Sequence, residues 1–90
     1  MVEMRCTVTG RVQGVRYRDY AQVSAGELGL VGSVCNRNDG SVFVVAQGEP
    51  DVLKEFVEYL HEGSLMAEVE GVSIEWGTIS VTYDDFSVLH

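Results

Sequence analysis

Hydrophobic and polar residues alternate with a period of two in several segments and change to a helical period in two others. In residues 4–8 an apolar side chain stands at every second position, so these side chains share one side of an extended chain, which predicts a half-buried strand. From Tyr17 to Leu28, apolar and small residues recur at spacings of three and four, and this spacing predicts one face of a helix. Gly29 follows as the expected helix end.

The rest of the chain continues the alternation of strands and helices. Asn, Asp and Gly at 38–40 tolerate positive φ, so a hairpin turn is predicted between two β-forming runs. Glu49-Pro50-Asp51 places proline and acidic residues where a helix begins. The other predicted elements are strands over 30–36 and 41–46, a helix with an apolar stripe from Val52 to Leu60, a strand over 72–76, and alternating residues at 79–83 and 86–89 that are either edge strand or loop.

The order strand, helix, strand, strand, helix, strand predicts an α+β fold. Each half is a strand–helix–strand unit, and right-handed crossovers put both helices on one face of the sheet. We therefore predict a ferredoxin-like split βαβ sandwich with a four- or five-stranded, mainly antiparallel sheet. At this length, residues 1–90 are expected to form a single domain. Proteins with this fold have many different activities, so function must be inferred from particular residues.

The charges are distributed unevenly along the chain. The formal net charge is −8, from 14 acidic and 6 basic residues. Five of the basic residues lie between Arg5 and Arg37, whereas twelve of the acidic residues lie outside that stretch. This concentration of arginines indicates an anion site, and ordinary surface scatter is the alternative. The overall negative charge would repel polyanions, so neither nucleic acid nor a membrane is expected as a partner.

Composition also bears on the setting of the protein. No apolar run approaches the ~20 residues of a membrane span, and the first residues do not have the pattern of a signal peptide. Two cysteines are too few for a disulfide scaffold, which favours a reducing, cytoplasmic setting. Nothing in the sequence requires more than a monomer.

The loop at 10–18 has features of an anion-binding turn. It reads Gly-Arg-Val-Gln-Gly-Val-Arg-Tyr-Arg and joins a predicted strand to a predicted helix. The first N–H groups of a helix lack intrahelical partners and lie at its positive end, so such a turn can hold an anion. Gly14 allows close backbone approach, and an arginine at the helix start adds a planar fork of donors. We predict phosphate or carboxylate binding, with a plain structural turn as the alternative.

The same nine residues resemble the first signature of the acylphosphatases, which reads Gly, any residue, Val-Gln-Gly-Val, any residue, an aromatic residue and Arg. The second signature of that family is similar to the spacing of four residues here, which are Asn36, Gly40, Val42 and Gly48. The chain departs from the family pattern at Ser33, where an aromatic residue is usual, and at Cys35, where a basic or other long residue is common.

The resemblance implies hydrolysis of acyl phosphates, which are carboxyl–phosphate anhydrides, to a carboxylate and inorganic phosphate. It implies that Arg18 holds the phosphoryl group and that Asn36 positions the attacking water, without a metal or another cofactor. Backbone N–H groups of the loop would complete the phosphate site, from Gln13, Gly14, Val15, Arg16, Tyr17 and Arg18. Inorganic phosphate and other anions would inhibit. The alternative is a non-catalytic anion-binding or protein-interaction module of the same fold.

Overall fold

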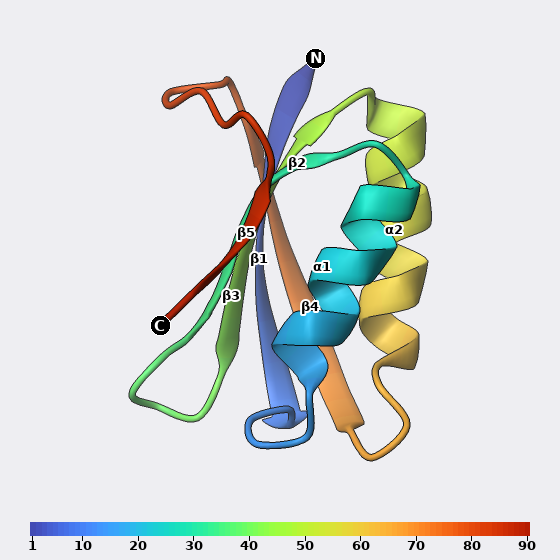
Figure 1. Ribbon diagram of the computed structural model, residues 1–90, viewed down its shortest axis with the longest axis vertical. Coiled ribbons are helices and arrows are strands. Elements are labelled where there is room, and N and C mark those ends of the chain that lie inside the picture. Colours follow the sequence, from blue (N-terminus) through green and yellow to red (C-terminus); the bar gives the residue numbers. More distant parts are fainter.

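Figure 1 shows the computed structural model, which describes residues 1–90. The elements in chain order are β1 (Val2–Arg11), α1 (Tyr17–Glu27), β2 (Val31–Asn36), β3 (Val42–Gly48), α2 (Pro50–Glu62), β4 (Glu68–Gly77) and β5 (Phe86–Leu89). The sheet has the strand order β4-β1-β3-β2-β5, and both helices cover one of its faces. All neighbouring strands are antiparallel except β2 and β5. The predicted ferredoxin-like α+β fold is confirmed.

The hydrophobic core lies between the sheet and the two helices. Met4, Cys6 and Val8 of β1 are fully buried, as the period-two pattern predicted. Phe56 of α2 packs edge-on against Phe86 of β5, with ring centroids 5.8 Å apart. Burial raises the pKa of the Cys6 thiol to about 12, so this thiol stays protonated and unreactive near neutral pH. Neither helix has the length and apolar character needed to cross a bilayer.

The stretch after β4 resolves the alternative that the sequence left open. Residues 78–85 form a loop, called here the crossing loop, and only Phe86–Leu89 forms a strand, parallel to β2. Strands β4 and β5 lie at opposite edges of the sheet, so the chain must pass from one edge to the other. The alternating apolar residues at 79–83 therefore have no neighbouring strand to pair with while the chain crosses.

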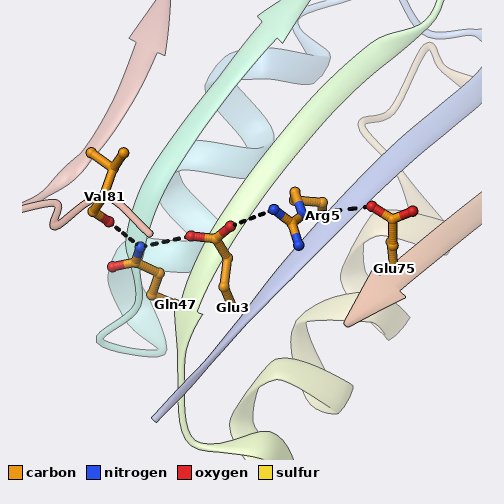
Figure 2. Close-up of polar contacts among 5 residues, drawn as sticks. All are labelled: Glu3, Arg5, Gln47, Glu75 and Val81. Carbon is orange, nitrogen blue, oxygen red and sulfur yellow. Dashed lines mark hydrogen bonds and ion pairs between the residues drawn. The ribbon is translucent and has the colours of Figure 1, made fainter. Parts of the chain in front are cut away.

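A polar cluster with a buried centre attaches the crossing loop to the sheet face opposite the helices (Figure 2). Glu3 and Gln47 lie opposite each other on β1 and β3, and both are buried. The Gln47 Nε2 donates to Glu3 Oε1 at 2.9 Å and to the Val81 carbonyl at 2.5 Å. Glu3 Oε2 lies 3.1 Å from Arg5 Nη1, and Arg5 Nε lies 3.7 Å from Glu75 Oε1. The cluster thus fixes the loop that leads into β5.

Replacing Gln47 by leucine is expected to destabilise the fold. The Val81 carbonyl and the buried Oε1 of Glu3 would lose this donor, although Glu3 Oε2 keeps its ion pair with Arg5. The loss costs roughly 1–3 kcal/mol of unfolding free energy. Urea denaturation measures the change. The control is Glu75→Gln, which alters an exposed partner in the same cluster and should change stability by less than about 0.5 kcal/mol. Equal effects of the two substitutions would contradict the importance of the buried pair.

Candidate anion-binding site

The β1–α1 loop, the β2–β3 hairpin and the α2–β4 segment lie at the lower end of the molecule in Figure 1, and the end of β5 contacts the start of α1. A cavity of about 270 Å³ lies there, at the N-terminus of α1. Its lining residues are Val12, Gly14, Arg16, Tyr17, Arg18, Asp19 and Asn36. Arg18 and Asn36 therefore line one cavity from two different elements.

The backbone before α1 takes a shape that leaves helix donors without a side-chain cap. Arg16 has φ 62° and ψ 25°, and it is the one non-glycine residue with positive φ. A left-handed conformation costs an L-residue roughly 1–2 kcal/mol, and strained residues of this kind gather at functional sites. Gly14 has φ 73° and open space where a Cβ would lie. The loop thus offers room and unpaired N–H groups to an anion.

Gln13 attaches this loop to the β2–β3 hairpin, next to Asn36. Its Nε2 donates to the carbonyl oxygen of Arg37 at 2.7 Å and to that of Ser41 at 2.9 Å. The Asp39 carboxylate accepts hydrogen bonds from the Ser41 hydroxyl and backbone N–H, and these bonds hold the pKa of Asp39 below its usual value. Hydrogen bonds therefore order the hairpin and join it to the loop, which fixes where Asn36 lies.

The opposite side of the loop is attached to the segment between α2 and β4. Ser64 Oγ donates to the Val15 carbonyl at 2.8 Å, and Arg11 Nη2 donates to the Met66 carbonyl at 2.9 Å. Tyr17, the first residue of α1, is buried, and its hydroxyl donates to the Leu60 carbonyl of α2 at 2.6 Å. Bonds to neighbouring segments therefore hold both sides of the loop, and an anion could meet Tyr17 mainly through its backbone.

The guanidinium of Arg18 is held by the end of β5. Its Nη1 donates to the Leu89 carbonyl at 3.0 Å and lies 3.4 Å from Nδ1 of His90. A guanidinium carries five N–H donors, so the bond to Leu89 leaves most of the fork for an anion. Sequence reasoning missed Leu89 and His90, because no local pattern shows that β5 pairs with β2 and ends beside α1.

The structure divides the loop residues that were predicted to bind phosphate. Gly14, Arg16, Tyr17 and Arg18 line the cavity. Val15 lines a neighbouring groove instead, and the Gln13 side chain is directed to the hairpin. Backbone donation to phosphate from Gln13 and Val15 stays a prediction. No group of three or more His, Cys, Asp or Glu side chains converges as metal ligands would.

Known proteins resemble this chain in both sequence and fold. The family described as Acylphosphatase matches residues 4–88. A protein named Acylphosphatase from Dehalococcoides mccartyi is 42% identical over 88 residues, which cover 97% of each chain. Another from Thermus thermophilus is 47% identical over 77 residues, covering 86% of this chain and 88% of that protein. The crystal structure of acylphosphatase from Bacillus subtilis matches with a TM-score of 0.96, at 36% identity and 100% coverage of both chains.

Replacing Gln13 by leucine is expected to loosen the hairpin. The Arg37 and Ser41 carbonyls would lose a donor, so the unfolding free energy should fall by about 1–2 kcal/mol. Amide hydrogen exchange at Arg37 and Gly40, whose N–H groups bond within the hairpin, should become faster. The matched control is Gln22→Leu, which removes a single side-chain bond to β5 at the Phe86 carbonyl. Hairpin exchange that responds equally to both substitutions would contradict the prediction.

Proposed function

The chain belongs to the acylphosphatase family, whose members are hydrolases that act on acyl phosphates, and we propose that the cavity at the start of α1 is the catalytic site. One observation carries the proposal: Arg18 and Asn36 line the same cavity, beside helix N–H groups that no side chain caps. The substrate is a carboxyl–phosphate anhydride. Its phosphoryl group enters the cavity, and its products are a carboxylate and inorganic phosphate.

The phosphoryl group is bound by donors that are already in position. The N–H groups of the loop and of the first helical turn face the anion, and the positive end of α1 adds to their effect. Arg18 supplies a full positive charge and a fork that matches phosphoryl oxygens. The Leu89 carbonyl holds this guanidinium at 3.0 Å, so little reorganisation is needed when charge develops on the phosphoryl oxygens.

Asn36 orients the attacking water. The side-chain amide is not a base, but its oxygen accepts a hydrogen bond and can direct the water at phosphorus. The water oxygen forms a bond to phosphorus while the bond from phosphorus to the bridging oxygen breaks, and the carboxylate leaves with that electron pair. The water proton passes to a phosphoryl oxygen. A carboxylic acid has a pKa of about 4, so the leaving carboxylate needs no general acid. Catalysis is then positioning and electrostatic stabilisation.

Substitutions at the two residues should affect different kinetic parameters. Arg18→Ala should lower kcat/KM for acetyl phosphate by about 10²–10³-fold and weaken inhibition by inorganic phosphate, because the anion loses its counter-charge. Asn36→Ala should lower kcat while phosphate inhibition stays close to that of the unchanged chain. Steady-state hydrolysis, measured with and without a chelator, gives both parameters, and the chelator should have no effect.

The control for Arg18 is Lys54→Ala, which removes an exposed cation from α2 and leaves the cavity intact. Full activity of Asn36→Ala would disprove the role of Asn36 in orienting water. If the unchanged chain binds phosphate but does not hydrolyse acetyl phosphate, a non-catalytic anion-binding module is the better description.

A further inference from the structure

A second hollow adjoins the catalytic cavity. It is a groove of about 460 Å³ between α1 and the segment that joins α2 to β4. Its lining is mainly apolar and consists of Val15, Arg16, Asp19, Tyr20, Val23, Ser64, Leu65 and Met66. Three apolar side chains of the groove are open to solvent: Leu65 is 97% exposed, Met66 60% and Val23 59%. Adjacent apolar side chains in water commonly mark a binding surface.

The groove wall is attached to the anion-binding loop. The hydrogen bonds from Ser64 to Val15 and from Arg11 to Met66 fix the backbone on both sides of Leu65. The exposed Leu65 side chain therefore stands on a segment that is tied to the catalytic loop. A ligand in the groove would consequently lie at a defined position relative to the cavity.

Two residues, Arg16 and Asp19, line both the cavity and the groove. A molecule whose anionic head occupies the cavity can thus continue past these residues into the groove. In an acyl phosphate the acyl carbon is separated from phosphorus by one oxygen atom, so the acyl group must lie beside the cavity. The groove is an apolar surface placed there.

We propose that this groove is the acyl subsite of the enzyme and that it selects acyl phosphates whose acyl group is apolar and uncharged. The proposal rests on the proposed function of the cavity. Arg16 and Asp19 are the charged residues of the groove and their charges are opposite, so the groove lining offers no net positive charge to a second anionic group on the substrate. The Asp19 carboxylate would repel such a group. The apolar side chains of Val23, Leu65 and Met66 would cover a hydrocarbon tail or ring.

The test compares two substrates, benzoyl phosphate and acetyl phosphate, which share the phosphoryl group and differ in the size of the apolar acyl group. The measured quantity is the ratio of their kcat/KM values. Leu65→Ser should lower this ratio by about fivefold, because it removes apolar surface from the proposed ring contact. The matched control is Val81→Ser on the crossing loop, where an apolar side chain 59% exposed lies outside the groove. The ratio should not change in that variant.

A binding measurement separates the failure of this proposal from failure of the proposed function. Phenylphosphonate and methylphosphonate are not hydrolysed, and amide chemical shifts report where each binds. Both should shift the amides of 14–18, and phenylphosphonate alone should also shift Val23 and Leu65. Absence of acetyl phosphate hydrolysis would count against the catalytic site. The shift pattern would then still show whether the groove binds the apolar group of a bound phosphonate. Unchanged groove amides, or an unchanged substrate ratio in Leu65→Ser, would overturn the acyl subsite.

A second copy of this chain is the other occupant that the exposed residues could accept. Sedimentation would then show a dimer that Leu65→Ser dissociates, and that result would overturn the proposal. A monomer at all concentrations, together with the expected shift pattern, supports the acyl subsite.

Discussion

The hydrogen bond from Arg18 to the Leu89 carbonyl connects the candidate site to the rest of the fold. Leu89 is the last residue of β5, and β5 stands beside α1 because it pairs in parallel with β2. The crossing loop that leads into β5 is held by Gln47 on the opposite face of the sheet. The direction of one guanidinium at the site therefore depends on a polar cluster that no ligand in the cavity would touch. A flexible arginine would have to be ordered by each bound anion, and the fold provides this order in advance.

The start of α1 shows a second constraint, which is the absence of a cap. A Ser, Thr, Asp or Asn side chain before a helix usually accepts its first N–H groups and stabilises it by about 1 kcal/mol. Here the preceding residue is Arg16, in a left-handed conformation with no capping bond. A cap would compete with an incoming anion for the same donors. The fold tolerates this uncapped and strained turn because Gln13 and Ser64 attach the loop to its two neighbours.

Most of the fold could be predicted from the sequence because its signals are local. The helix over Tyr17–Glu27 follows from the spacing of its apolar residues, and the hairpin follows from the turn residues at 38–40. The contact between Arg18 and Leu89 joins residues 71 positions apart, and no pattern within either segment encodes it. The sequence also did not show that Gly14 and Arg18 line the cavity while Val15 lines the groove. Positive φ at Arg16 changes the direction of the chain between these neighbouring residues. The resemblance to the family signatures thus indicated Arg18 and Asn36, which line the cavity, but nothing in the sequence indicated the groove.

The acidity of the chain is compatible with binding an anion because charge acts over limited distances. At an ionic strength of 0.1 M the Debye length is about 10 Å, so acidic residues far from the cavity contribute little to the potential inside it. The groups that line the cavity therefore determine the potential inside it, and there Arg16, Arg18 and the positive N-terminal end of α1 outweigh the single carboxylate of Asp19. Hydrolysis of an acyl phosphate produces a negatively charged carboxylate oxygen where the neutral bridging oxygen of the anhydride stood. In the proposed site this negative charge grows beside Asp19 as the bond to phosphorus breaks, and the repulsion is greatest for the free carboxylate, which favours departure of the product. The same carboxylate that would disfavour an anionic acyl group would thus also help to clear the site.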